Sequence, residues 1–538
     1  MEFARIASFV LVSMVIVPAI AWGTGTNTPA RNPYLSAANY ATTHFNPAQT
    51  DSFPYPAPKG TFNIDLRKFP RVAGGPVGYM QLASTDPNYL WVTTTGAIAY
   101  VDVSKGGWRE VSRIATPGLT AIDPETFEKV LAQPITSVAQ AEAATKDLGV
   151  DWRRLANNVY MFVDRDNVLY ANTADGIVNA YGLVDPKNPS KGIKVLRSLD
   201  FREQMKKIGA GGTSEAMKQY GAIMTATNLT YDGYLIIGTN RSITVTSRDF
   251  NGPQHTIEFG PDEFVSNSIA VDEKGGIYVA SDTTMYKLVW NGKKLSKDEA
   301  DGAWSSPYDI GREPPSVKFG RGTGSTPTLM GFGSDPDKLV VITDGADHMK
   351  VVAFWRNRIP ANFKQQPGTK SRRIAGQIEI GAGLDPKPEF IQSEQSVVVR
   401  GYGAFVVNNI RSQGNKDKLI DVLVGGPVYD PPAGVERVEW SPTTRQWHSV
   451  WARGDVVGTS MVPAMSSASN IAFVNGYTKK DGWELTGMDW STGETVHRSI
   501  FGQDTLGNGA YALIQFLPNG DLLFNSIGGP IRVHYDNK

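Results

Sequence analysis

The chain has 538 residues and a balanced charge, with 53 Lys and Arg against 53 Asp and Glu. This balance argues against a protein that binds nucleic acid or a membrane surface by electrostatic attraction. The absence of cysteine excludes disulfides, thiolate metal sites and a cysteine nucleophile. Apolar residues make up 41%, an ordinary globular value, and 55 glycines and 33 prolines predict many short elements joined by tight turns.

The N-terminus has the order of a secretory signal peptide. Arg5 precedes a largely apolar run over residues 6–17, and Ala19-Ile20-Ala21 supplies an A-x-A cleavage pattern. The run is shorter than the roughly 20 apolar residues that span a bilayer. We therefore expect residues 1–21 to be removed and the mature protein to be secreted or periplasmic, without membrane attachment. An uncleaved anchor is the alternative.

Residues 22–60 are rich in Pro, Asn, Thr and Ser and show no periodicity. Such a segment is typical of an extended arm, and we expect it to lie on the protein surface. His44, within this arm, is expected to be an ordinary surface residue. A lid residue over the mouth of a channel is the alternative for His44.

Over residues 61–538 a unit of short strands and tight turns repeats. Two of eight candidate units are YMQLASTDPNYLWVTTTGAIAYVDVSKGG from Tyr79 and IMTATNLTYDGYLIIGTNRSITVTSRD from Ile223. Each unit would be a small antiparallel sheet that cannot bury both faces alone, so radial stacking gives one shared core. We predict an all-β fold, a single β-propeller with eight blades. Seven blades are the alternative, and a pair of β-sandwiches is the rival architecture.

Three insertions interrupt the repeat, near residues 121–156, 202–220 and 411–434, and the first two have helical patterns. The last unit shows three strands. A strand within residues 60–72 is expected to complete it and close the ring, which would remove two exposed sheet edges.

Three blades resemble known propellers. The sequence LTGMDWSTGETV at 485–496 resembles the blade signature of quinoprotein alcohol dehydrogenase-like propellers, as do STPT at 325–328 and VVITDG at 340–345. The sequences NSIAVD at 267–272 and GIYVA at 276–280 resemble calcium-dependent lactonase and NHL-type blades. These resemblances imply a propeller fold. The tryptophan-docking pattern is not repeated, and the adjacent cysteine pair that caps the quinone in many quinoproteins is impossible here, so we expect no PQQ.

Polar residues at the entry to the first strand of each unit are candidates for a site, because such loops meet at one end of a propeller channel. Glu394 with Asn228 and Asn267 would offer oxygen ligands to calcium. Bound calcium could polarise an ester or lactone carbonyl. The simpler interpretation of each asparagine is that it caps a turn.

Candidate catalytic residues are Glu394, Asp344, His348 and Arg400. Asp344 and His348 share one predicted hairpin with Asp347, a grouping that could provide acid–base chemistry, although an Asp-Gly hairpin with solvated neighbours is the simpler interpretation. Arg400 could pair with Glu394 or hold a substrate carboxylate, with a structural contact between blades as the alternative.

Together these features favour an exported propeller that binds a small organic molecule at the channel mouth. It would act as a metal-assisted hydrolase or as a lyase or isomerase. The alternatives are a non-catalytic scaffold for a protein or glycan and a quinone-dependent oxidoreductase. A nucleic-acid partner is not expected.

Overall fold

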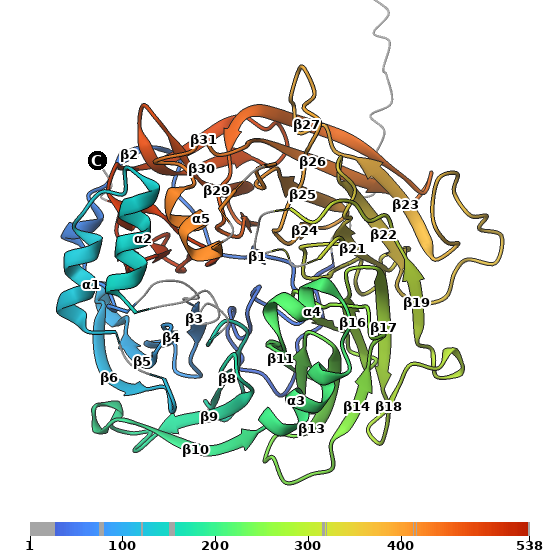
Figure 1. Cartoon of the computed structure of the whole chain (residues 1–538), viewed down its shortest axis with the longest axis horizontal. Coiled ribbons are helices and arrows are strands. Elements are labelled where there is room, and N and C mark those ends of the chain that lie inside the picture. The colour runs from blue at the N-terminus through green and yellow to red at the C-terminus, as the bar shows by residue number, and fades with distance from the viewer. Residues whose placement is uncertain are drawn as a thin grey trace, which may run out of the picture.

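The computed structural model describes residues 27–74, 80–119, 122–149, 157–314, 318, 320–412, 414–415 and 417–535. The expected signal peptide, residues 1–21, lies outside the described residues. Sheets stand side by side around a central axis, and the chain passes from one to the next in order (Figure 1). The prediction of an all-β propeller is therefore confirmed.

Eight sheets make up the described part of the chain, and in each the first strand lies next to the axis. The first three contain β3 (Met80–Ala83), β4 (Tyr89–Thr93), β5 (Ala97–Asp102) and β6 (Arg109–Ala115); β7 (Phe162–Val163), β8 (Leu169–Asn172), β9 (Ile177–Leu183) and β10 (Ile193–Asp200); and β11 (Met224–Leu229), β12 (Tyr234–Thr239), β13 (Ser242–Ser247) and β14 (His255–Glu258).

The next three contain β15 (Ala270–Val271), β16 (Gly276–Ala280), β17 (Thr284–Trp290), β18 (Leu295–Ser296) and β19 (Trp304–Pro307); β20 (Thr328–Met330), β21 (Leu339–Thr343), β22 (Lys350–Trp355) and β23 (Ile374–Glu379); and β24 (Val398–Arg400), β25 (Gly403–Val407), β26 (Ala433–Ser441) and β27 (Gln446–Val457). The last two contain β28 (Ala464–Ser466), β29 (Ile471–Thr478), β30 (Gly482–Asp489) and β31 (Thr495–Gly502); and β32 (Ile514–Phe516), β33 (Leu522–Ser526) and β34 (Gly529–Val533).

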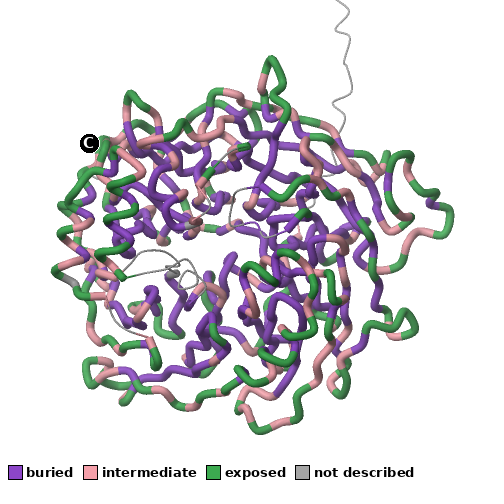
Figure 2. The backbone as a smooth tube through the Cα atoms, viewed as in Figure 1, coloured by how far each residue is buried: buried purple, intermediate pink, exposed green. Residues whose placement is uncertain are grey.

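The middle strands of the sheets are buried on both faces, because each sheet packs between two neighbours. Strand β12 is an example, with five of its six residues buried. Strands of this kind read as nearly continuous runs of β-branched and other apolar residues. Burial is accordingly concentrated toward the axis and between the sheets, and exposed residues lie mainly at the periphery (Figure 2).

Seven of the eight sheets have at least four strands, and the last, β32 to β34, has three. The segment expected to complete this last sheet is divided between two sheets. Strand β2 (Gly60–Asn63) pairs in parallel with β31 of the preceding sheet, so that part of the prediction is wrong. Farther along the same segment, Arg71 forms an isolated antiparallel bridge with Ile531 of β34.

Five α-helices lie within the three insertions. They are α1 (Pro124–Leu131), α2 (Val138–Asp147), α3 (Arg202–Ala210), α4 (Glu215–Tyr220) and α5 (Lys418–Val424). Asp417 caps α5 by accepting hydrogen bonds from the backbone amides of Leu419 and Ile420. None of the helices in the described ranges is long and apolar enough to cross a bilayer.

The N-terminal arm enters the channel, so the expectation of a surface position is wrong. Nearly all residues from Tyr40 to Phe53 are buried. Strand β1 (Ser52–Phe53) pairs in parallel with β28 on its axial side, near the centre of the ring (Figure 1). The sequence could not show this position, because the hydrogen-bond partners of the arm come from strands far along the chain.

The arm makes a hydrogen bond to the innermost strand of every sheet. The contacts are Tyr40 O to Ala83 N, Ala41 O to Val163 N, Asn32 Nδ2 to Leu229 O, Pro47 O to Val271 N, Ala48 O to Leu329 N, Thr50 O to Val399 N, Asp51 O to Met465 N and Tyr40 Oη to Phe516 O, at 2.8–3.0 Å. Most of these partners lie toward the C-terminal ends of the innermost strands. The arm therefore fills that end of the channel and ties the sheets to one another.

Backbone strain is concentrated in the same segment. Tyr40, His44, Phe45, Gln49 and Asp51 all have positive φ angles although none is glycine. Residues in this region persist only where surrounding contacts fix them. The hydrogen bonds to the ring supply that constraint.

Candidate functional site

The loops that lead into the innermost strands meet at the end of the channel opposite to most of the arm's backbone contacts. Asn267, before β15, donates from Nδ2 to the carbonyl oxygen of Gly324, before β20. A Cβ on Gly324 would lie 2.6 Å from Cα of Glu394, before β24. The close approach of these loops therefore depends on glycine, and it brings two predicted metal ligands, Asn267 and Glu394, to either side of one residue.

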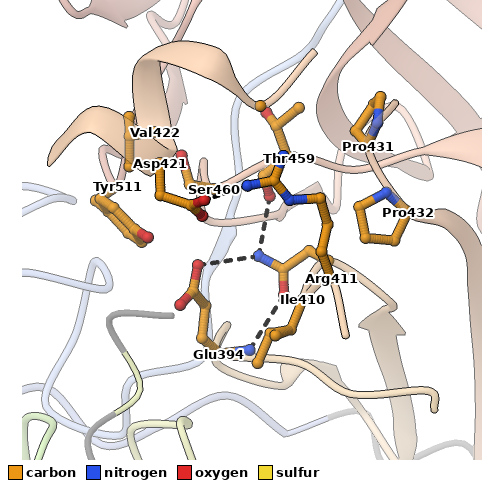
Figure 3. A pocket seen from close by; sticks show the side chains of 12 residues that line it. Glu394, Ile410, Arg411, Asp421, Val422, Pro431, Pro432, Thr459, Ser460 and Tyr511 are labelled. Carbon is orange, nitrogen blue, oxygen red and sulfur yellow. Dashed lines mark hydrogen bonds and ion pairs between the residues drawn. The ribbon is translucent and has the colours of Figure 1, made fainter. Parts of the chain in front are cut away.

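Glu394 lies in the same pocket as the phenol of Tyr511, which is in the loop before β32. In Figure 3 the Tyr511 hydroxyl points toward the Glu394 carboxylate. Burial, together with the carboxylates of Glu394 and Asp421, raises the pKa of Tyr511 well above its usual value. The phenol therefore stays protonated at neutral pH and can act as a hydrogen-bond donor.

Asn409 fixes the position of Glu394 from the other side. Its Oδ1 accepts from the Glu394 backbone amide at 3.1 Å, and its Nδ2 lies 3.5 Å from Glu394 Oε1. The same Nδ2 donates to the carbonyl oxygen of Thr459 at 3.1 Å. The carboxylate is thus held between two neutral polar groups in a defined orientation.

Arg411 and Asp421 form an ion pair beside this carboxylate, with Arg411 Nη2 donating to Asp421 Oδ1 (Figure 3). Asp421 lies in the first turn of α5, and its Oδ1 also accepts from the Asn415 amide at 2.8 Å. The Arg411 guanidinium lies 4.7 Å from the centroid of the Tyr429 ring. Among the described residues, Arg411 Nη1 is buried and has no hydrogen-bond acceptor.

Two adjoining pockets meet at Arg411. The inner one, shown in Figure 3, has a cavity volume of about 40 Å³ and is lined by Glu394, Tyr511 and Asp421 among others. The outer one has a volume of about 530 Å³ and is lined partly by Phe390. The inner pocket has room for water or a reacting group, whereas the outer one lies in the size range of small-molecule sites.

The remaining predicted metal ligand, Asn228, is committed to the backbone. Its Nδ2 donates to Ile269 O at 3.2 Å and its Oδ1 accepts from the Leu229 amide at 2.8 Å. The amide oxygen of Asn267 accepts from the Tyr160 hydroxyl at 3.2 Å. No group of three or more His, Asp or Glu side chains that could hold a metal occurs in the described part of the chain. A calcium site formed by one glutamate and two asparagines stays a prediction.

Asp344 and His348 lie in the loop after β21, but they make separate contacts. Asp344 is fully buried and accepts from Lys350 Nζ at 2.8 Å, while burial raises its carboxyl pKa. His348 Nε2 lies 2.8 Å from Pro388 O. Asp347 forms an ion pair with Arg312. Asp344 also accepts from the backbone amides of Ala346 and Lys350, which agrees with the turn interpretation, but it is buried and not solvated.

Arg400 lies six residues beyond Glu394, at the opposite end of β24. An extended segment of that length spans about 20 Å. Arg400 Nη1 donates to Asn470 Oδ1, in the next sheet. This is the contact between blades that was the alternative to a catalytic role.

The sequence did not point to Tyr511, Asn409, Arg411 or Asp421. Arg411 and Asp421 do fall inside the insertion at 411–434, where charged residues flank a short apolar run. The position of this insertion was the one feature of the sequence that pointed to Arg411 and Asp421. It identifies the segment but does not show which other residues the segment contacts.

Comparison with known proteins identifies one relative by sequence. An uncharacterized protein of Archaeoglobus fulgidus is 30% identical over 519 residues, which are 94% of this chain and 89% of that protein. The chain belongs to the same family as this archaeal protein. No protein-family model matches the chain.

Solved structures with a similar arrangement include a europium-containing methanol dehydrogenase, 11% identical, with a TM-score of 0.49 over 91% of this chain and 89% of that one. A periplasmic gluconolactonase of Pseudomonas aeruginosa is 14% identical, with a TM-score of 0.37 over 64% of this chain and 85% of that one. Likenesses this distant carry no argument about function. Membership of the quinoprotein-like superfamily stays a prediction.

Proposed function

We propose that this protein is an exported propeller enzyme that binds a small organic molecule at the channel mouth and transforms it by acid–base chemistry centred on Glu394. The reaction classes that fit are hydrolysis of an ester or lactone and proton transfer in a lyase or isomerase. The observation that carries the proposal is the contact between Glu394 and Tyr511, next to a pocket of about 530 Å³.

The roles follow from the contacts. Glu394 would accept a proton from water or from a carbon acid, because its carboxylate is oriented by Asn409. Tyr511 would stabilise the charge on Glu394 by donating its phenolic hydrogen. Arg411, at the junction of the two pockets, would stabilise negative charge on a substrate oxygen.

The arm closes the far end of the channel, an arrangement that suits an enzyme as well as a scaffold. A channel open at both ends would give solvent free access to the reacting groups, whereas a plugged channel gives the mouth a floor. His44 Nε2 lies 3.4 Å from Thr326 Oγ1, two residues beyond Gly324, so the arm reaches the layer beneath Glu394.

The experiment compares the mature protein with Glu394→Gln on a panel of aliphatic and aromatic esters and lactones, with Glu494→Gln as the control at an exposed glutamate. We expect a loss of at least 100-fold in kcat/KM for Glu394→Gln, with an unchanged Tm, and wild-type activity for the control. Tyr511→Phe should shift the acidic limb of the pH–rate profile. Equal activity of Glu394→Gln and wild type would refute the role of Glu394.

Calcium remains a prediction of the sequence, tested separately by elemental analysis of protein purified without chelator and by melting before and after EDTA. Stoichiometric calcium and a lowered Tm after EDTA would add a metal to the site. The acid–base proposal does not depend on this result, because no step above involves a metal.

A non-catalytic scaffold is the second candidate, and the filled channel favours it, because a plugged axis is expected where only the outer faces bind partners. The two candidates differ in the effect of Glu394. A scaffold would bind its partner equally well with Glu394→Gln and would show no turnover on any member of the panel.

A further inference from the structure

The outer pocket has a composition that suits one class of ligand. Six of its twelve lining residues are apolar: Leu384, Pro388, Phe390, Ile410, Pro432 and Ala433. The other six lining residues are polar or charged: Arg312, Glu389, Asn408, Arg411, Ser412 and Asp430. A site of this kind holds an apolar body and fixes its orientation through a small number of polar contacts.

Arg411 is the polar group with unused hydrogen-bonding capacity. Its guanidinium carries five N–H donors, and its side chain is only 13% exposed. Asp421 accepts from Nη2, while Nη1 has no acceptor within the described residues. A buried donor without an acceptor is costly, so a ligand oxygen placed there would be bound favourably.

The cover of the guanidinium is an exposed aromatic ring. Tyr429 lies over Arg411 at 4.7 Å and is itself 43% exposed, so it can change rotamer without disturbing the core. Movement of this ring would leave more of the guanidinium free to contact a ligand.

The charge of the lining limits the ligand to a single negative charge. Two cations, Arg312 and Arg411, face two anions, Glu389 and Asp430. Arg312 is further neutralised by Asp347 and Arg411 by Asp421, while Asp430 is paired with Lys479, which leaves a surplus of one acidic group. A doubly charged phosphate would meet this acidic surplus, whereas one carboxylate can use the bidentate geometry that arginine offers.

We propose that the outer pocket binds a small organic monocarboxylate, with its apolar body against Phe390 and Ile410 and its carboxylate on the Arg411 guanidinium. This inference names the ligand class of the proposed site and rests on that proposal for its location. In a hydrolase of esters or lactones, the same class would include the acid product.

The test is calorimetric titration of the mature protein with hexanoate and phenylacetate, with the matched neutral amides hexanamide and phenylacetamide, and with inorganic phosphate. We expect each acid to bind at least ten-fold more tightly than its amide, and phosphate to bind more weakly than either acid. Equal affinity of acid and amide, no binding of any acid at 10 mM, or tighter binding of phosphate would overturn the inference.

Arg411→Gln should abolish the difference between acid and amide. The matched control is Arg248→Gln, because Arg248 also pairs with a buried aspartate, Asp164, and also lies over a tyrosine ring, that of Tyr34 at 5.3 Å. If Arg411→Gln does not fold, Arg411→Lys keeps the charge and loses the planar fork, and it should lower acid affinity several-fold. Loss of the difference in Arg248→Gln as well would overturn the inference.

Titration of Glu394→Gln separates this inference from the proposed function. Tight acid binding by this variant, together with no turnover by the wild type, would support the monocarboxylate site and refute the proposed catalysis. Turnover by the wild type without any preference for acids over amides would support the proposed catalysis and refute the monocarboxylate site.

Discussion

The imidazole Nδ1 of His44 lies 2.9 Å from both carboxylate oxygens of Asp51, and both residues belong to the arm that fills the channel. His44 is 4% exposed and Asp51 is fully buried. The pair closes a loop of the arm, residues 44–51, that contains four of the five strained residues, His44, Phe45, Gln49 and Asp51. The pair therefore stabilises the conformation of the arm within the channel.

Asp51→Asn should destabilise the protein by about 3 kcal/mol, because removing one partner of a buried pair leaves the other without compensation. Burial raises the pKa of Asp51, and the neighbouring His44 opposes that shift. Urea unfolding at pH 7 measures the effect. Asp65→Asn, at an exposed carboxylate, is the control and should change the midpoint little. A urea midpoint for Asp51→Asn equal to that of the control would show that the pair between His44 and Asp51 does not stabilise the protein.

Stability should fall as the pH falls from about 6.5 to about 4 because of His497. Burial lowers the pKa of His497 to about 4, and its Nδ1 and Nε2 lie 2.7 Å from Pro58 O and 2.8 Å from Ser499 Oγ. The unfolded chain takes up a proton at about pH 6.5, while the folded one takes it up only near pH 4. Stability present above the unfolded pKa is thus lost as the pH falls, by about 3 kcal/mol.

Urea midpoints between pH 4 and 7.5 measure this loss. His497→Gln should flatten the dependence over that window, whereas His534→Gln, at a partly exposed histidine, should leave it in place. The same slope in wild type and His497→Gln would assign the acid sensitivity to other groups.

Asp282→Asn should stabilise the protein at pH 7. Burial raises the pKa of Asp282 to about 6, so its charged form is held at a cost at neutral pH. The asparagine oxygen can still accept from the Phe264 amide, which lies 2.9 Å from Asp282 Oδ1. The folded pKa is raised, so the favourable contribution is present below about pH 4 and lost as the pH rises through 6.

The expected gain is about 2–3 kcal/mol at pH 7, disappearing by pH 4. Thermal melts at the two pH values test it, and Asp249→Asn at an exposed turn is the control. A destabilised Asp282→Asn at pH 7 would mean that the charged carboxylate makes a favourable interaction that outweighs its burial.

Phe53→Ala should cost about 3–5 kcal/mol, since it removes a large side chain from the axis. Phe53 is 1% exposed and stacks on Phe516 of β32 with ring centroids 5.7 Å apart. Phe62→Ala, on the outer strand β2, should cost less. Similar losses for the two variants would show that the arm is held mainly by its backbone hydrogen bonds and not by its aromatic side chains.

Repetition made the propeller predictable. Units such as those from Tyr79 and Ile223 carry their strands and turns in local sequence, and many similar small sheets have few ways to share a core. Completion of the last sheet was predicted only in part, because Arg71 lies eight residues beyond the end of β2 and the two join different sheets. Neighbouring outer edges offer equivalent hydrogen-bond partners, and the sequence does not distinguish between them.

The candidate site was predicted at one residue, Glu394, and missed at its partners. Glu394 stood out as a carboxylate before an apolar strand, a position that local sequence reveals. Tyr511 comes from a loop more than one hundred residues later, and Arg411 comes from an insertion with no motif. Their relation to Glu394 depends on how adjacent loops approach across the ring.

The sequence by itself determined the repeating strands, their turns and a propeller of seven or eight blades, because hydrogen bonding within a hairpin and burial of its faces act over short distances along the chain. Tertiary structure alone decided that the arm fills the channel, that Arg400 contacts Asn470, and that Glu394 meets Tyr511. The reason is physical: the partners in these contacts are brought together only when the sheets close into a ring. Asn228, Asp344 and His348 illustrate the same point, since their polar groups are used by whichever backbone and side chains the closed ring places beside them.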